Sequence, residues 1–257
     1  MTKSAETAHD LVVFGATSFV GQILTRYLLE TYGVGQSVKW AIAGRSESKL
    51  NTLKSSLGDK ARDLPVILAD AADDAALKSM CEQTRVIIST VGPYALYGEP
   101  LVKACVQTGT DYCDLTGEVQ WSRKMVKRYE AEAKTSGARI VHCCGFDSIP
   151  SDMGVWFLQN QAEQTFGMPC QDVRMRVKTA KGEFSGGTVA SMMNVAKEAA
   201  ADPKLREELA NPFSICPPEH RSKTRQPSLK GAEFDKTFNA WLAPFVMGAI
   251  NTRVVHR

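Results

Sequence analysis

Short apolar segments alternate with helical segments over the first 143 residues of the chain. Runs such as Leu11–Phe14 and Val86–Val91 are continuous and apolar, as expected of strands that are buried on both faces of a sheet. Between such runs the apolar residues recur at helical spacing, for example over residues 19–29. A repeated strand–helix–strand order is typical of a parallel sheet with helices on both faces. We therefore predict a doubly wound α/β fold for this part of the chain.

The first strand-like run ends in a turn with the sequence GATSFVG, which opens a helix. Gly15 permits a tight turn, Ser18 is small enough for a pyrophosphate to approach, and Gly21 permits close packing of helix on strand. The free amides and the dipole at the start of a helix favour an anion there. This predicts a Rossmann-type dinucleotide site. Its expected residues are Gly15, Thr17, Ser18, Phe19, Val20 and Gly21.

The end of the second strand selects the cofactor. NAD-binding proteins carry an acidic residue there, which holds the ribose 2′-hydroxyl. This chain instead reads Ala43-Gly44-Arg45-Ser46, without a carboxylate. A guanidinium can pair with a 2′-phosphate. We therefore expect NADP(H) rather than NAD(H), although Arg45 also fits an ordinary surface arginine. The expected contacts are Gly44, Arg45, Ser46 and Lys49.

The third and fourth strands complete the predicted cofactor site, because ligands of open α/β sheets lie at the carboxyl ends of the strands. We expect Val91, Gly92 and Pro93, which follow the fourth strand, to line the nicotinamide ribose. Asp70 follows the third strand. It either approaches the adenine edge or caps the next helix.

Hydride transfer leaves the protein to orient the substrate and to manage one proton. Three residues are our candidates. Tyr94 follows the predicted nicotinamide loop and either donates a proton or forms an aromatic wall. Glu118 either binds the cofactor amide or a substrate amine, or belongs to the first turn of a helix. Asp147 lies where two domains are expected to join. Because neighbouring residues of a strand point to opposite faces, we do not expect a nucleophile pair from His142 and Cys143.

The pattern changes after Pro150. Polar and apolar residues alternate over Asp172–Lys178, which predicts a strand of an antiparallel sheet. We expect a NAD(P)-binding domain over 1–150 and a second, smaller α/β (α+β) domain over 151–257 for substrate binding or dimerisation. The apolar run Trp241–Ile250 lies almost at the end of the chain. We therefore expect the second domain to be truncated at its carboxyl end.

Composition excludes several classes of function. The 31 basic and 28 acidic residues give a net charge of +3, which is too balanced to indicate nucleic-acid binding. Seven cysteines without a Cys-x-x-Cys pair argue against a disulfide framework and a zinc site, and favour reduced thiols in the cytoplasm. From the polar residues 1–10 we expect no signal peptide, and no apolar run reaches membrane-spanning length. We expect a cytoplasmic protein without a metal.

The motifs together resemble those of the saccharopine dehydrogenase-like oxidoreductases. They spread over most of the chain. The matching stretches are Gly15–Gly21, Ala43–Arg45, Val91–Pro100, Tyr112–Glu118, Gly145–Gly154 and Lys178–Thr188. Family sequences usually continue past the motif PFVMGAINTR, residues 244–253, which agrees with the expected truncation.

The resemblance implies an NADP-preferring oxidoreductase that transfers a hydride to or from a C=C, C=N or C=O bond. The branch resembled here includes trans-acting enoyl reductases of lipid synthesis, so a small-molecule or lipid-linked substrate is expected. Peripheral membrane contact and a homodimer are compatible with it. Two alternatives stay open, because fold does not fix function. One is a saccharopine-type amino-acid dehydrogenase, and the other is a non-enzymatic nucleotide-binding interaction module.

Overall fold

The computed structural model of the chain describes residues 7–257, so part of the polar amino-terminal segment lies outside the described residues. The chain divides into two compact units. The first comprises the residues up to Cys144 together with Phe184–Ala196, and the second comprises Gly145–Glu183 and Lys197–Arg257. These ranges differ from the expected domains 1–150 and 151–257. The division falls at residue 144, and the segment that begins at Phe184 belongs with the first unit, where its Ser191 hydrogen-bonds Glu118.

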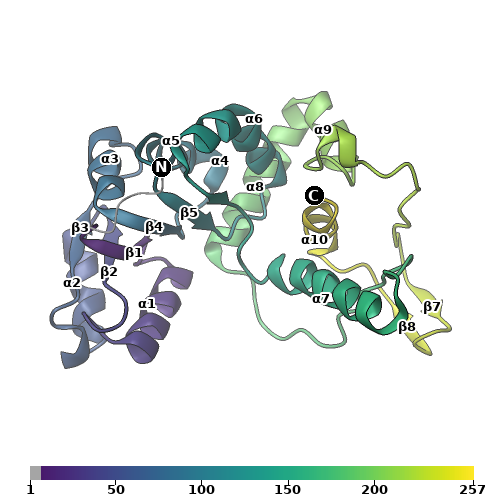
Figure 1. The fold of residues 1–257 in the computed structure, drawn as a ribbon, viewed down its shortest axis with the longest axis horizontal. Helices are drawn as coiled ribbons and strands as arrows, with labels where there is room; N and C mark the ends of the chain where they lie inside the picture. The colour runs from purple at the N-terminus through teal and green to yellow at the C-terminus, as the bar shows by residue number, and fades with distance from the viewer. Residues whose placement is uncertain (1–6) are drawn as a thin grey trace. The chain divides into compact units, whose positions relative to one another are not determined.

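A six-stranded parallel sheet forms the centre of the first unit (Figure 1). The strands lie in the order β3-β2-β1-β4-β5-β6. From β1 in the middle the chain adds β2 and β3 on one side, and it then crosses to the other side of β1 to add β4, β5 and β6. This is the doubly wound, Rossmann-type arrangement predicted from the sequence. The strands are β1 His9–Phe14, β2 Trp40–Gly44, β3 Val66–Leu68, β4 Thr84–Ser89, β5 Asp111–Asp114 and β6 Ile140–Val141.

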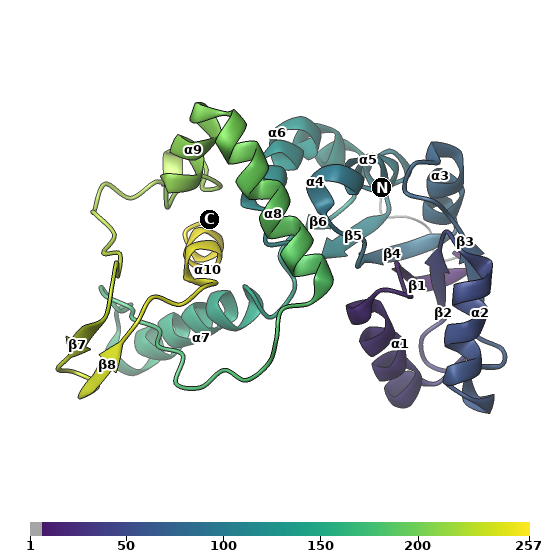
Figure 2. The same cartoon turned by 180° about the vertical axis from the view of Figure 1, so that it is seen from behind.

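Helices cover the sheet in two groups, which Figure 2 shows from behind. Alternate residues of β1 point to opposite faces, so Val13 packs with α1 and α2 while Val12 packs with α3, α5 and α6. Each group closes a continuous apolar core against the strands. The helices are α1 Phe19–Tyr32, α2 Glu47–Ser56, the 3-10 turn η1 Asp59–Ala61, α3 Asp74–Glu82, α4 Tyr94–Tyr97, α5 Glu99–Thr108 and α6 Val119–Ser136.

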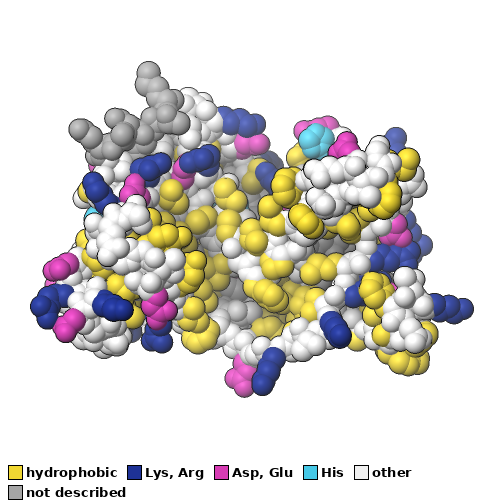
Figure 3. All heavy atoms as spheres, turned by 60° about the horizontal axis from the view of Figure 1, so that its bottom comes forward, with side chains coloured by type: hydrophobic (Ala, Val, Ile, Leu, Met, Phe, Trp, Pro, Cys, Tyr) yellow, Lys and Arg dark blue, Asp and Glu magenta, His cyan; other side chains and the backbone are white. Residues whose placement is uncertain are grey.

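The second unit contains helices and one antiparallel hairpin, β7 with β8. Its elements are α7 Ile149–Phe166, α9 Pro203–Ala210, η2 Pro218–His220, β7 Glu233–Asp235, β8 Ala240–Leu242 and α10 Gly248–Val255. Helix α8, Gly186–Ala201, begins in the first unit and ends in the second. Many apolar side chains of the second unit are exposed, including Trp156 and Phe157 of α7. Figure 3 shows one face of the molecule with many hydrophobic side chains at its surface.

The prediction of a strand over Asp172–Lys178 is wrong, because these residues adopt no regular secondary structure. An extended segment becomes a strand only when a neighbour takes up its backbone hydrogen bonds. Among residues 7–257, none forms a ladder with this segment. None of the helices described is both long enough and apolar enough to span a bilayer.

Candidate functional site: the carboxyl edge of the parallel sheet

The glycine turn after β1 is tightly packed. Gly15 has φ +86°, and a Cβ added there would lie 2.6 Å from Cγ2 of Val91. A Cβ on Gly21 would lie 2.3 Å from the carbonyl oxygen of Gly15. Both distances are shorter than real Cβ contacts. The two glycines therefore allow the backbone approaches that a dinucleotide-binding turn requires.

Ser18 joins this turn to the fourth strand. Its side chain is the N-cap of α1 and accepts a hydrogen bond from the Gly21 amide at 2.9 Å. The Ser18 hydroxyl donates to Oγ1 of Thr90 at 3.0 Å, and Thr90 donates to the Gly15 carbonyl oxygen at 2.9 Å. Thr90 was not among the predicted site residues. Its signal in the sequence is only that it is the first residue after β4.

The rest of the turn and the end of β2 fit the phosphates of NADP. Phe19 is exposed, whereas Thr17 and Val20 are half-buried. Beside them, the exposed Arg45 follows the buried Gly44, and the exposed Lys49 lies in the first turn of α2. Ser46 caps that helix by accepting from the Lys49 amide at 3.4 Å. Two cations beside a helix start, with no carboxylate among residues 43–46, suit a 2′-phosphate.

Asp70 has a local partner. Its Oδ1 accepts a hydrogen bond from the amide of Ala72 at 3.0 Å. The cap of α3 is Asp73 rather than Asp70, because Oδ1 of Asp73 accepts from the amides of Ala75 and Ala76. Asp70 thus shapes the turn after β3, and its approach to the adenine edge stays a prediction.

The loop after β4 consists of a half-buried Val91, an exposed Gly92 and a buried Pro93, and leads directly into α4. Tyr94 is buried, and its hydroxyl donates to the carbonyl oxygen of Ser89 at 3.0 Å. Burial raises the pKa of Tyr94 well above its ordinary value. The phenol therefore holds its proton and ties the loop to the end of β4.

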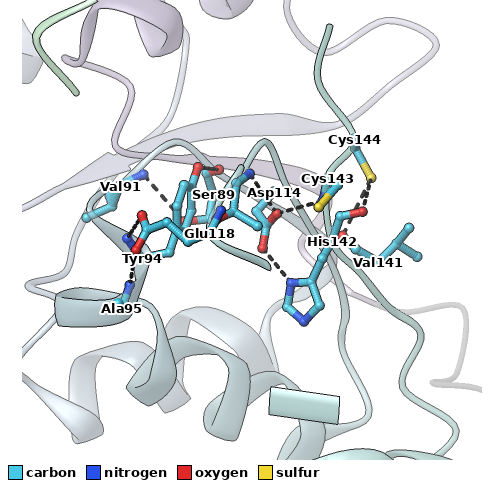
Figure 4. Close-up of polar contacts among 11 residues, drawn as sticks. Ser89, Val91, Tyr94, Ala95, Asp114, Glu118, Val141, His142, Cys143 and Cys144 are labelled. Atoms are coloured by element: carbon cyan, nitrogen blue, oxygen red, sulfur yellow. Dashed lines mark hydrogen bonds and ion pairs between the residues drawn. The ribbon is translucent and has the colours of Figure 1, made fainter. Parts of the chain in front are cut away.

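Glu118 is the acceptor at the centre of this edge (Figure 4). The side chain is 2% exposed. Its Oε1 accepts from the Tyr94 amide at 2.8 Å, and its Oε2 accepts from the Ala95 amide at 2.9 Å. The free amides at the start of α4 thus find their partner in a carboxylate that follows the neighbouring strand. The same Oε1 accepts from the hydroxyl of Ser191 at 2.8 Å.

A second buried carboxylate lies beside it. Asp114 ends β5, and its Oδ2 lies 2.7 Å from Nδ1 of His142, just after β6 (Figure 4). Its Oδ1 accepts from the amides of Thr116 and Cys143, each at 3.0 Å. This carboxylate therefore joins the loops that follow two neighbouring strands.

The structure brings Tyr94 and Glu118 together, whereas Asp147 belongs to the second unit. Asp147 is half-buried, and burial raises the pKa of its carboxyl group. Ser191 was not predicted as a site residue. It lies 73 residues from Glu118 along the chain, and nothing in the sequence pairs the two.

These features define the chain as a Rossmann-type NADP-binding protein. Its parallel sheet is doubly wound, and its glycine turn and the basic end of β2 suit a phosphorylated dinucleotide. Residues 11–141, just over half of the chain, match the family described as the saccharopine dehydrogenase NADP binding domain. The chain belongs to this family. Its membership confirms the expected resemblance and the expected preference for NADP(H).

Curated relatives match almost the whole chain. A Mycobacterium tuberculosis (strain H37Rv) protein with the provisional name of a trans-acting enoyl reductase is 40% identical over 254 residues, which is 96% of this chain and 60% of that protein. A Mycobacterium bovis (strain BCG) protein named trans-acting enoyl reductase is 36% identical over 265 residues, which is 98% of this chain and 62% of that protein. The chain thus spans about three-fifths of the length of these relatives.

Among solved structures, the chain is similar to saccharopine dehydrogenase (L-Glu forming) from Saccharomyces cerevisiae. The TM-score is 0.48 and the sequence identity 19%, over 61% of this chain and 32% of that one.

Proposed function

We propose that the chain is part of an NADP-dependent oxidoreductase that transfers a hydride to or from a C=C, C=N or C=O bond. The observation that carries the proposal is the pairing of two features at one sheet edge. In the Gly15–Gly21 turn the chain packs too closely at Gly15 and Gly21 for a larger residue. Arg45 and Lys49 are exposed beside the end of β2, where no carboxylate lies among residues 43–46. Membership of a family defined by an NADP-binding domain supports the same conclusion.

Different residues of the chain would bind different parts of NADP(H). The amides at the start of α1 would take the pyrophosphate, and Arg45, with Ser46 and Lys49, would take the 2′-phosphate. The loop Val91–Pro93 would line the nicotinamide ribose. When bound, NADPH supplies the hydride.

The residue that manages the proton stays a prediction, and its candidates are Tyr94, Glu118 and Asp147. Tyr94 and Glu118 already hold one another and the backbone, which suits positioning. Asp147 is half-buried, and burial raises the pKa of its carboxyl group. If Asp147 manages the proton, Asp147→Asn should lower turnover while leaving NADPH affinity unchanged.

We propose an enoyl, lipid-linked substrate. The support is the name of the relatives at 36–40% identity, together with the exposed apolar side chains of the second unit. The expected homodimer, the peripheral membrane contact and the cytoplasmic location stay predictions.

The first experiment is a titration of the purified chain with NADPH and with NADH. Arg45→Ala should weaken NADPH binding about ten- to hundredfold, as expected for a lost charge-assisted contact worth about 1.5–3 kcal/mol, and should leave NADH binding unchanged. Arg62→Ala is the control, because Arg62 is exposed and forms an ion pair with Asp59, three residues away on the surface. Equal effects of both variants would contradict the assignment of Arg45.

Substrate assays follow from the titration. Oxidation of NADPH with enoyl thioesters supports the enoyl reductase. Oxidation only with an imine formed from an amino acid supports the saccharopine-type alternative. Binding of NADPH without turnover on either class supports the interaction module.

A further inference from the structure

Glu118 receives hydrogen bonds from two segments that are far apart in sequence. Two donors are the amides of Tyr94 and Ala95 in the first turn of α4. The third is the hydroxyl of Ser191 in α8, which shares Oε1 with the Tyr94 amide. Because the carboxylate is buried, these three donors take the place of the water that would otherwise solvate it. A hydrogen bond to an ionised group is also stronger than one between neutral groups.

Apolar burial contributes little to the attachment of helix α8 to the first unit. None of its described residues is buried. Its half-buried residues recur at helical spacing and make one side of the helix. Those that belong to the first unit are Ser191, Asn194 and Val195. Since this side removes little apolar surface from water, polar contacts such as that of Ser191 must contribute much of the attachment.

Ser191 also lies beside the loop that leads into α4. Its Oγ is 3.9 Å from the place where a Cβ on Gly92 would lie, which is ordinary contact distance. The serine thus lies beside the loop that follows β4 and hydrogen-bonds the carboxylate that accepts from the first two residues of α4.

We propose that Ser191 is a positioning residue for the nicotinamide half of the NADP(H) site. Its hydroxyl completes the set of donors around Glu118, and Glu118 fixes the backbone of Tyr94 and Ala95 at the end of the Val91–Pro93 loop. The inference rests on the proposed function only where it identifies that loop as the nicotinamide side.

Two ligands separate positioning from general stability. NADPH reaches the loop, whereas 2′-phospho-ADP lacks both the nicotinamide and its ribose and uses only the turn and the β2 end. Ser191→Ala should weaken NADPH binding about fivefold to tenfold, within the range of one lost hydrogen bond, and leave 2′-phospho-ADP binding unchanged. Ser191→Thr keeps a hydroxyl and should restore NADPH affinity. Val189→Ala, at an exposed position of α8, is the control and should change neither affinity.

Hydrogen exchange provides a readout that needs no ligand. In Ser191→Ala the amides of residues 94–97 should exchange about tenfold faster, and those of β1 should not change. Unchanged exchange at 94–97, equal weakening of both ligands, or failure of Ser191→Thr to restore affinity would each overturn the inference. If the wild-type chain binds neither ligand, the proposed function fails, and the exchange result alone decides whether Ser191 orders the loop.

Discussion

Nδ1 of His142 lies 2.7 Å from Oδ2 of Asp114, and the Asp114 side chain is fully buried. The other oxygen of this carboxylate accepts from the backbone amides of Thr116 and Cys143. One side chain at the end of β5 therefore fixes the loops after β5 and β6. Because Glu118 follows in the first of these loops, the position of the α4 cap depends on this pair.

Replacing Asp114 should cost much stability. In Asp114→Ala two buried amides and the imidazole lose their acceptor, so we expect the free energy of unfolding to fall by about 3 kcal/mol or more. Urea unfolding followed by circular dichroism measures it. Asp59→Ala is the control, because Asp59 is exposed and its ion pair with Arg62 is worth about 1 kcal/mol at most. Equal urea midpoints for the two variants would show that the Asp114 contacts contribute little.

Gly15→Ala should abolish NADPH binding at micromolar concentrations. The added Cβ would have to displace Val91 and Thr90, and with them the Ser18 contact that ties the turn to β4. Gly35→Ala separates this effect from backbone strain, because Gly35 also has a positive φ, +69°, but no atom within 4 Å of the added Cβ. Backbone strain should cost each variant about 1–2 kcal/mol of stability, to which Gly15→Ala adds the cost of the clash, and only Gly15→Ala should lose the nucleotide in a calorimetric titration. Retained affinity in Gly15→Ala would contradict the role of the turn.

Glu118→Gln should destabilise the first unit although it preserves shape. An amide nitrogen replaces one of the two acceptor oxygens, so one of the donors from Tyr94, Ala95 and Ser191 faces another donor. We expect a loss of about 1–3 kcal/mol in thermal or urea unfolding. Glu82→Gln, at an exposed ion pair with Lys78, should change stability by less than about 1 kcal/mol. If the two substitutions had the same effect, the buried cap would not depend on a carboxylate.

Asp147 gives a pH-dependent prediction. Burial raises the pKa of its carboxyl group in the folded chain above the ordinary 3.8. The stability that the neutral carboxyl group contributes is therefore fully present below pH 3.8. It is lost as the pH rises through the pKa that the group has in the folded chain. Asp147→Asn stays neutral at all pH values, so it should unfold at a higher urea concentration than wild type at pH 7. The difference should vanish as the pH falls toward 3.8. A difference between wild type and Asp147→Asn that stayed constant with pH would show that the Asp147 carboxyl group does not cause it.

The sequence predicts local features of this protein well. The alternation of apolar runs and helices fixes the parallel sheet, because continuous apolar strands must be covered on both faces. The residues of the Gly15–Gly21 turn act within a few residues of one another, and the structure adds a local contact that was not predicted, the cap of α1 by Ser18. The same local reasoning fails over Asp172–Lys178, where alternation is present but no partner strand is described.

The tertiary structure decides which polar side chains meet. Glu118 could have been a ligand contact or a helix residue on sequence grounds, and its three donors come from residues 94, 95 and 191. Likewise Asp114 finds His142 across 28 residues. The sequence alone determined the fold class and the cofactor, because strand patterning, turn chemistry and the charge at the end of β2 are properties of short segments. The buried carboxylates and their donors required the folded chain, because such contacts depend on distances in space that sequence spacing does not encode.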